Sequence, residues 1–239
     1  MVVDAMSTDD TEEIAREMGA RVLVHPYQGN IEQKNFALEQ TQHDWILAID
    51  ADEAVSEALG REIGETLARE GESFVGYELN RITHHLGRWH RHGEWYPDWQ
   101  LRLFRRSHGR WLGTNPHGRV VVDGPVRRLP GHLEHYSYKD LADQMERVQS
   151  FSTIQARALY LSGRRAGFGD LLFRPLFRFF RAYVIRLGFL EGIPGFVAAA
   201  VTAFYVFLKY AKLWELTRVA RTEGAEGTKP GSKRSDAPR

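Results

Sequence analysis

The sequence predicts an α/β protein with a parallel-type sheet, followed by a C-terminal helical segment that associates with a membrane. Strand-like and helix-like segments alternate over the first seventy residues, which is the pattern of parallel α/β sheets. The continuous apolar run 45–49 is typical of a strand that is covered on both faces. After residue 163, arginine alternates with phenylalanine and a long apolar run follows.

Three predicted strands and three predicted helices alternate in the first part of the chain. The first helix has acidic residues in its first turn, and Gly19 can close it. The third helix carries Leu59, Ile63 and Leu67 at helical spacing. The predicted strands end at residue 3 and cover 21–25 and 44–50, and the predicted helices cover 7–20, 30–40 and 56–70.

The pattern changes after Gly71, where short strands are separated by loops rich in His, Trp, Gly and Pro. The tail from about Arg221 has the composition of a disordered segment. The later predicted strands are 74–82, 98–106 and 118–124, and a long amphipathic helix is predicted over 137–163. The predicted parts are an α/β domain over 1–137, a helical region over 138–217 and a disordered tail over 218–239.

Composition narrows the class of protein. With 239 residues and 43% apolar residues, the chain can form one sizeable domain with an appended segment. The net charge of +1 does not favour nucleic acid as a partner. The chain has no cysteine, which excludes disulfides and thiolate metal sites and fits a reducing compartment. The first residues lack the basic start and apolar core of a signal peptide.

Three carboxylates, Asp50, Asp52 and Glu53, follow the apolar run directly. Ligands of open α/β sheets bind beyond the carboxyl ends of the strands. Asp50 and Asp52 point the same way if the chain stays extended, and a hard divalent cation then relieves their mutual repulsion. Mg²⁺ or Mn²⁺ would accept one or two carboxylates together with diphosphate oxygens. The alternative is a solvated turn in which Glu53 begins the next helix.

Three stretches, in this order, carry a resemblance to a known family: VVDAMSTDDTEEIA, QKNFALEQTQHDWILAIDADE and YPDWQLRLFRR. They resemble the family 2 glycosyltransferases, and more narrowly the group that includes bacterial lipopolysaccharide core glucosyltransferases, over about residues 2–214. The resemblance implies a GT-A fold, a nucleotide-sugar donor, an inverting transfer and a catalytic role for residues 1–137. It also implies roles for single residues at the donor site. Asp50 and Asp52 would hold a metal on the donor diphosphate. Asp4 would help to bind the nucleotide, and Lys34 and Asn35 would lie near the donor.

The sequence departs from the family pattern where it begins. The family usually opens with a strand that bears a Thr-x-Asn-Glu-like segment, and with a helix, before the strand that reads VVD. Here the sequence starts at MVVD. That first strand normally lies in the middle of the sheet and forms the floor of the nucleotide pocket. The resemblance therefore predicts an N-terminally truncated GT-A-type sheet that lacks its usual first strand.

An inverting transfer needs a group that takes the proton of the acceptor hydroxyl. Asp98 is the first candidate, because it lies among aromatic residues, whose ring faces can bind a sugar. An apolar environment of this kind would also raise the pKa of its carboxyl toward the working pH. The alternative is that Asp98 caps a turn after Pro97. The family often has a His-Glu pair after the arginine-rich strand, but here His117 is followed by Gly118. The base is therefore expected to be Asp98 or His117.

Histidines are concentrated in one part of the chain, because eight of the ten lie between His84 and His135. His132 and His135 are candidates for a late metal ligand, and we assign His135 to the metal. The alternative is a histidine that only makes hydrogen bonds in a loop. The spacing matches no zinc pattern.

Three arginines lie on the predicted strand 98–106. Arg102, Arg105 and Arg106 would pair with phosphate, either in the donor or in a phosphorylated acceptor. Arg102 and Arg105 are the two that we assign to the donor. The alternative is a solvated basic strand edge.

The segment 164–186 interleaves six arginines with aromatic residues, among them Phe173, Phe177, Phe179, Phe180 and Tyr183, and Asp170 is its only acid. This composition suits an anionic lipid surface. The next stretch, 187–208, has about the length of a membrane span, but Glu191, Pro194 and three glycines interrupt it. We expect an amphipathic or re-entrant hairpin at the cytoplasmic face of the inner membrane rather than a span. The alternatives are an oligomer interface or a lid, while the apolar run disfavours nucleic acid.

These observations predict a membrane-associated, metal-dependent glycosyltransferase that uses Mg²⁺ or Mn²⁺. It would pass a hexose, glucose from UDP-glucose, to a lipopolysaccharide core or another lipid-linked saccharide, and the substrate identity depends on the resemblance alone. One alternative is transfer to a polyprenyl phosphate, whose nucleophile is already anionic and needs no base. Two others are an inactive membrane-associated module and a phosphohydrolase that uses Asp50 and Asp52.

Overall fold

The computed structural model describes residues 1–70, 72–114 and 117–226, and residues 114, 117 and 219–226 by their backbone alone. The chain divides into two compact units. The first comprises residues 1–83 and 97–136, and the second comprises residues 84–96 and the chain from Ser137 onward. The segment 84–96 thus groups with the C-terminal helices. The division of the sequence at residue 137 stays a prediction.

The N-terminal part of the first unit alternates strands and helices, as the sequence predicts. The third predicted strand is shorter than expected, because a turn with a hydrogen bond from Glu53 N to Asp50 O (3.0 Å) follows it and leads into a further strand. The elements are β1 (Val2–Asp4), α1 (Thr11–Glu17), β2 (Val22–Val24), α2 (Asn30–Glu39), β3 (Trp45–Leu47), β4 (Glu53–Val55) and α3 (Glu57–Glu70).

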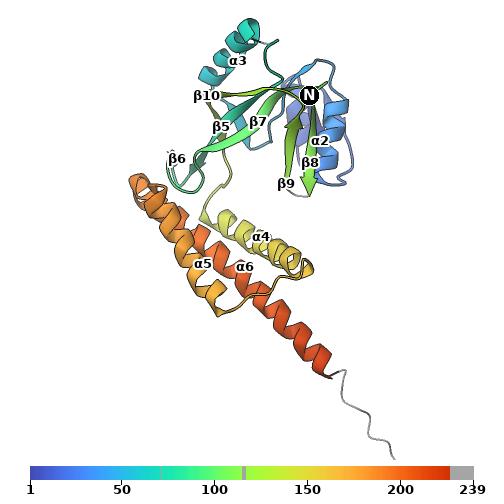
Figure 1. Cartoon of the computed structure of the whole chain (residues 1–239). Coiled ribbons are helices and arrows are strands. Elements are labelled where there is room, and N and C mark those ends of the chain that lie inside the picture. The colour runs from blue at the N-terminus through green and yellow to red at the C-terminus, as the bar shows by residue number, and fades with distance from the viewer. Residues whose placement is uncertain (71, 115–116, 227–239) are drawn as a thin grey trace, which may run out of the picture. The chain divides into compact units, whose positions relative to one another are not determined.

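The rest of the first unit consists almost entirely of strands, which Figure 1 shows in green. The hairpin β8–β9 forms a two-stranded antiparallel sheet of its own. The strands that follow α3 are β5 (Gly76–His85), β6 (Arg88–His90), β7 (Asp98–Arg105), β8 (Gly109–Thr114), β9 (His117–Val122) and β10 (Val126–His135), of which β6 and the last two residues of β5 group with the second unit.

The strands form a mixed sheet rather than one that is parallel throughout. The six-stranded sheet has the order β3-β7-β5-β10-β4, with β6 on β5. In it β5 pairs with β10 in parallel, whereas β7 runs antiparallel to both β3 and β5. β1 and β2 form a separate parallel pair. The register of β3 on β7 sets Leu47 opposite Leu103, so that Asp50 and Arg102 come close to each other beyond the end of β3.

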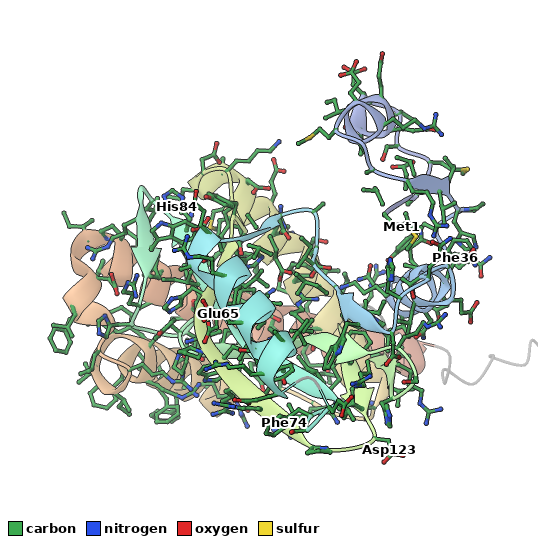
Figure 2. All side chains as sticks on the ribbon, turned by 90° about the horizontal axis from the view of Figure 1, so that it is seen from above. Met1, Phe36, Glu65, Phe74, His84 and Asp123 are labelled. Atoms are coloured by element: carbon green, nitrogen blue, oxygen red, sulfur yellow. The ribbon has the colours of Figure 1, made fainter. Side chains whose placement is uncertain are left out.

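A leucine-rich core fixes α3 on this sheet. Leu59 of α3 is fully buried with Tyr77 and Leu79 of β5, and Leu133 of β10 closes the cluster. Burying a side chain such as Leu59 contributes about 2 kcal/mol. Ile63 and Leu67 pack against the same cluster, which confirms the predicted helical face. Figure 2 shows the chain from above, with Glu65 labelled on α3 and Phe36 on α2.

The second unit contains three long helices and short turns between them. α5 packs along α6, and α4 packs along α6 as well, around Ala156, Val206, Tyr210 and Leu213 (Figure 1). The elements are α4 (Leu141–Leu161), α5 (Phe168–Phe180), a π-helical turn (Arg181–Ile185), a 3₁₀ turn (Gly188–Glu191) and α6 (Gly192–Glu226). α6 continues into the range 218–239, where a disordered tail was predicted, and residues 227–239 of that tail lie outside the described residues.

Candidate active site

Asp50 lies just beyond β3 and holds two cations. Its Oδ1 atom is 2.6 Å from Lys34 Nζ, and its Oδ2 atom is 2.6 Å from a guanidinium nitrogen of Arg102. Partial burial raises the pKa of Asp50, but the charge of Arg102 and the hydrogen bond from Lys34 outweigh it and hold the pKa at about 2. Asp50 is therefore ionised at neutral pH and keeps the two cations together.

Glu53 bridges two arginines from inside the unit. Its side chain is 0% exposed, and its Oε1 atom is 2.6 Å from Arg102 and 3.0 Å from Arg81. Its Oε2 atom accepts a hydrogen bond from Asp50 N (3.0 Å). A carboxylate without solvent access is tolerated only where cations and donors surround it. Glu53 therefore fixes the guanidinium groups of two neighbouring strands and does not begin a helix, the alternative that its position after Asp52 left open.

Asp98, at the start of β7, ends this series of charges. Its Oδ2 atom is 2.7 Å from Arg81 Nη2, and its Oδ1 atom accepts a hydrogen bond from Gln100 (2.6 Å). The carboxylate is 29% exposed. The apolar surround predicted for it is wrong, because Arg81 reaches it from β5, a strand that the sequence does not mark as its neighbour. Gln100, to which the sequence assigns no chemistry, orients the same carboxylate.

The six side chains form one continuous row of alternating charge. Each member contacts the next one in the row at 3.0 Å or less, and Asp98 is the last member. In order the row is Lys34, Asp50, Arg102, Glu53, Arg81 and Asp98. A row of this kind holds its end groups in fixed positions, because moving one member leaves a neighbour unpaired.

Asp52 leaves this row and faces His135. The turn after β3 breaks the strand alternation, so the chain is not extended here, and the prediction that Asp50 and Asp52 point the same way, which assumes an extended chain, does not apply. Asp52 Oδ2 is 3.4 Å from His135 Nε2, and a hydrogen bond from His135 lowers the pKa of Asp52. The two carboxylates remain close enough for the charge of Asp50 to act on the pKa of Asp52. The structure therefore brings Asp52 and His135 together, as a shared metal site requires.

Trp111 of β8 lies beneath the two cations. Lys34 Nζ is 4.3 Å from the centre of its ring, and the Arg102 guanidinium carbon is 5.8 Å from it. Asn35 exchanges two hydrogen bonds of 3.0 Å with the backbone N and O of Trp111. Asn35, which was predicted to lie near the donor, thus ties α2 to β8. In this way it also positions Lys34, the residue before it in the chain.

Arg102 has an unused donor in this arrangement. It is 4% exposed, and within the described residues no acceptor is in hydrogen-bonding geometry with its Nε atom. A buried guanidinium donor without a partner is costly and indicates a missing acceptor. An anionic oxygen, such as one of a diphosphate, is the type of acceptor that guanidinium prefers.

Several predicted site residues lie outside this cluster. Asp4, at the end of β1, accepts hydrogen bonds from the backbone N and the hydroxyl of Ser7, and these lower its pKa. Arg105, at the other end of β7 from Asp98, pairs with Asp44 at 2.7 Å. The structure therefore brings neither Asp4 nor Arg105 into contact with Asp50.

Arg106 and His132 make contacts outside the row, and His117 is described by its backbone alone. Arg106 donates to Thr41 O (3.0 Å), and the backbone O of His132 accepts from Ser56. His117 is the first residue of β9, but its side chain lies outside the described residues.

Gly118 follows His117 where the resemblance led us to expect an acid, and the local packing favours glycine at this position. A Cβ atom added at Gly118 would lie 2.7 Å from Cγ1 of Ile31 on α2. Atoms at such a separation overlap, so a side chain at this position would push α2 away from β9. Lys34 and Asn35 are carried by the same helix. The position of α2, and with it that of Lys34, depends on the absence of a side chain here.

Comparison with known proteins decides the family. The profile of Glycosyl transferase family 2 matches residues 1–128. The chain belongs to this family. Family 2 glycosyltransferases have the GT-A fold, so the mixed sheet that carries Asp50 and Asp98 is a GT-A domain, as the resemblance predicts.

Named relatives cover most of this family 2 glycosyltransferase. The lipopolysaccharide core biosynthesis glycosyltransferase LpsC of Rhizobium meliloti is 32% identical over 222 residues, covering 90% of this chain and 82% of that protein. An uncharacterised glycosyltransferase of Rickettsia typhi is 31% identical over 231 residues, covering 92% and 79%. One of Rickettsia felis is 31% identical over 260 residues, covering 98% and 88%. The likeness thus extends through the helical unit.

Family 2 glycosyltransferases generally use a divalent metal, and the residues of this site fit one. Among the residues that the structure describes, no group of three or more acidic or histidine side chains would hold a metal without help. Mg²⁺ and Mn²⁺ at nucleotide sites take only one or two protein ligands and complete their coordination with phosphate oxygens and water. Asp52, with its side chain 39% exposed, and His135 supply ligands of the right type.

Proposed function

We propose that this family 2 glycosyltransferase moves a hexose, glucose from UDP-glucose, to a lipopolysaccharide core or another lipid-linked saccharide, with inversion. The observation that carries the proposal is the pair of cations, Lys34 and Arg102, held on Asp50 beside Asp52. The acceptor class is supported by the name of the relative LpsC. The reaction would take place at the cytoplasmic face of the inner membrane.

The donor diphosphate is assigned to the cation pair. Lys34 Nζ and the unused Nε donor of Arg102 would bind diphosphate oxygens and stabilise the charge that develops as UDP departs. Mg²⁺ or Mn²⁺, held by Asp50, Asp52 and His135, would neutralise the same charge when bound. Asp4 is proposed to contact the nucleoside, as the resemblance implies. Arg105 pairs with Asp44 near the other end of β7, and its role as a donor ligand stays a prediction.

Asp98 is assigned as the base. The acceptor hydroxyl oxygen attacks the anomeric carbon from the side opposite the diphosphate, the new glycosidic bond forms, and the bond to the diphosphate oxygen breaks. Asp98 takes the hydroxyl proton as this bond forms. Arg81 donates to Oδ2 from both Nε and Nη2, and Gln100 donates to Oδ1, which fixes the orientation of Asp98 and leaves the second lone pair of Oδ1 for the proton. His117 is the alternative base.

A transfer assay with labelled UDP-glucose tests this proposal. The full chain is incubated with Mn²⁺ and one of three additions: a truncated lipopolysaccharide, a polyprenyl phosphate or no acceptor. We expect label in the lipopolysaccharide and release of UDP that depends on it. UDP-galactose, which differs at one stereocentre, is the matched donor control and should be a poorer substrate.

Each other outcome of the assay contradicts the proposal in a distinct way. Label in the polyprenyl phosphate alone would show the alternative acceptor class. Consumption of UDP-glucose at the same rate without any acceptor would show a phosphohydrolase. Equal use of both donors would contradict the assignment of glucose, and no turnover with any addition would favour the inactive membrane-associated module.

A further inference from the structure

α5 carries its apolar side chains on the outside of the helical unit. Phe168, Phe173, Leu176 and Phe177 are 76, 67, 59 and 61% exposed, although these residue types are usually buried. Phe173, Leu176, Phe177 and Phe180 lie within about 100° of one another at 100° per residue, which places these four along one face of the helix. A helix of a soluble unit normally buries this face, so α5 has the opposite orientation.

The arginines of α5 are turned toward the unit and engaged there. Arg174 lies over the ring of Tyr210 on α6, with its guanidinium carbon 5.0 Å from the ring centre. Arg178 and Arg181 both contact Glu94 Oε1, at 3.1 and 2.9 Å. These contacts fix the rotation of α5 about its axis. The outward direction of the phenylalanines is therefore a consequence of specific ion pairs.

The exposed apolar face continues past the end of α5. The π-helical turn, the 3₁₀ turn and the first turn of α6 contribute further exposed side chains, and Ile193 is 80% exposed. Together with α5 they expose on the order of 500 Å² or more of apolar surface, a size at which the patch of a soluble protein is often functional. The members beyond α5 are Val184, Ile185, Leu187, Phe189, Leu190 and Ile193.

The helical stretch Gly188–Arg218, most of which belongs to α6, is long enough to cross a membrane and contains an 18-residue segment with a mean hydropathy of 1.6. Its surroundings argue against a span. Lys212 donates to Gln149 O, Ser152 Oγ and Thr153 Oγ1 of α4, at 2.8, 2.8 and 2.7 Å. α4 is an amphipathic helix that carries four charged residues and several polar ones, so the half of α6 that packs on it does not face lipid.

The start of α6 is held by polar contacts as well. Glu191 is 1% exposed, and its carboxylate contacts Arg88 (2.8 Å), His92 Nδ1 (2.8 Å) and Arg91 N (2.9 Å). Glu94, with its two arginines, lies in the same segment 84–96. A re-entrant hairpin would insert this turn deepest and bring its ion pairs into hydrocarbon, where charges are expensive. The turn therefore stays at or above the headgroup level.

We propose that the outward face of α5, continued by residues 184–193, lies in the plane of an anionic lipid leaflet and inserts its side chains to the acyl boundary. Six arginines and one acid within residues 164–186 give the charge that anionic headgroups attract. Arg174, Arg178 and Arg181 are still partly exposed at the border of the face, where such side chains reach headgroups. The inference deepens the proposed membrane location and decides between the peripheral and the re-entrant mode.

Vesicle binding by the full chain tests the face itself. We expect co-sedimentation with phosphatidylglycerol vesicles, weaker binding to phosphatidylcholine vesicles, and at least a tenfold loss of binding for the double variant Phe173→Ser/Phe177→Ser. The double variant Phe151→Ser/Leu161→Ser removes exposed apolar side chains from α4 and is the matched control, which should bind as the native chain does. Equal binding by both double variants, with native circular dichroism spectra, would overturn the inference, as would a dimer that only the α5 variant abolishes.

Depth measurements test the in-plane mode without any enzyme activity. The chain has no cysteine, so Phe177→Cys, Leu190→Cys, Phe204→Cys and Leu161→Cys each accept one environment-sensitive fluorophore. Nitroxide lipids with shallow or deep labels should quench position 177 at a shallow depth of about 5–10 Å, and position 161 should not be quenched. Position 204 as the deepest site would indicate a span, and position 190 as the deepest would indicate a re-entrant hairpin. Either result contradicts the proposal, whereas failure of the transfer assay alone would leave it intact.

Discussion

Replacing Asp98 with asparagine is expected to lower kcat by about 10²–10⁴-fold, which is the contribution of a positioned general base. Asparagine keeps the shape of the side chain and the hydrogen-bond acceptor for Arg81, but it cannot take a proton. KM for the donor should change little, because Asp98 is assigned to the acceptor and not to the diphosphate. The measurement is steady-state kinetics of glucose transfer to the lipopolysaccharide acceptor.

Glu78→Gln is the matched control for Asp98→Asn. Glu78 lies on the neighbouring strand β5 and pairs with Arg128 at 2.8 Å, so the variant also neutralises an arginine-bound carboxylate of the sheet. It should leave kcat within about twofold, since exposed ion pairs contribute little. A near-native rate for Asp98→Asn would mean that the acceptor arrives as an anion, as a polyprenyl phosphate does, or that His117 is the base.

Glu53→Gln is expected to lower the free energy of unfolding by about 3–5 kcal/mol. The change leaves the guanidinium groups of Arg102 and Arg81 without the buried charge that they share, and removing one partner of a buried ion pair has a cost of this size. Glutamine still fits the volume and can accept from Asp50 N. Urea denaturation of the full chain, followed by circular dichroism, measures the loss.

Glu70→Gln serves as the comparison for stability. Glu70 pairs with Arg127 where both side chains are partly exposed, so this variant should lose about 1 kcal/mol or less. The variants should also differ in donor binding, because Arg102 depends on Glu53 for its position. Similar unfolding free energies for Glu53→Gln and Glu70→Gln would contradict the role assigned to the buried row.

The sequence predicts the N-terminal elements well because their apolar residues follow simple periods. Leu59, Ile63 and Leu67 have helical spacing and do pack on the sheet. β10 escapes such a prediction, since it contains Pro130 and Gly131 and several charged residues. It forms because its partner β5 offers a parallel edge, and the register shifts between Leu129 and His132 to accommodate the irregularity. That pairing is a tertiary property that no local pattern contains.

The sequence marks residues at both ends of the row of charged side chains, but not the contacts that connect them. The motif marks Asp50, and the resemblance marks Lys34, but nothing local connects Asp98 to either. Arg81 and Glu53 make that connection across three strands. The sequence does contain one sign of this connection. Arg81 and Arg102 both lie in predicted strands that contain apolar residues, and a buried arginine requires an acidic partner. Finding which acid requires the strand order.

In the helical unit, too, the sequence alone does not predict which face of α5 is exposed. The sequence indicates that Arg and Phe alternate at helical spacing in α5, and this pattern alone fits either a buried or an exposed apolar face. The contacts of Arg178 and Arg181 with Glu94 decide the rotation. Glu94 lies more than eighty residues earlier in the chain, so the pairing cannot be inferred from the helix.

Calorimetric titration of the full chain with UDP-glucose, with and without Mn²⁺, tests the central claim most directly. The claim is that Asp50 and Asp52 bind a divalent cation on the donor diphosphate, next to Lys34 and Arg102. We expect binding that strengthens at least tenfold with Mn²⁺, and an Asp52→Ala variant in which Mn²⁺ no longer has this effect. Equal affinity with and without Mn²⁺, or an Asp52→Ala variant that responds to Mn²⁺ as the native chain does, would contradict the account.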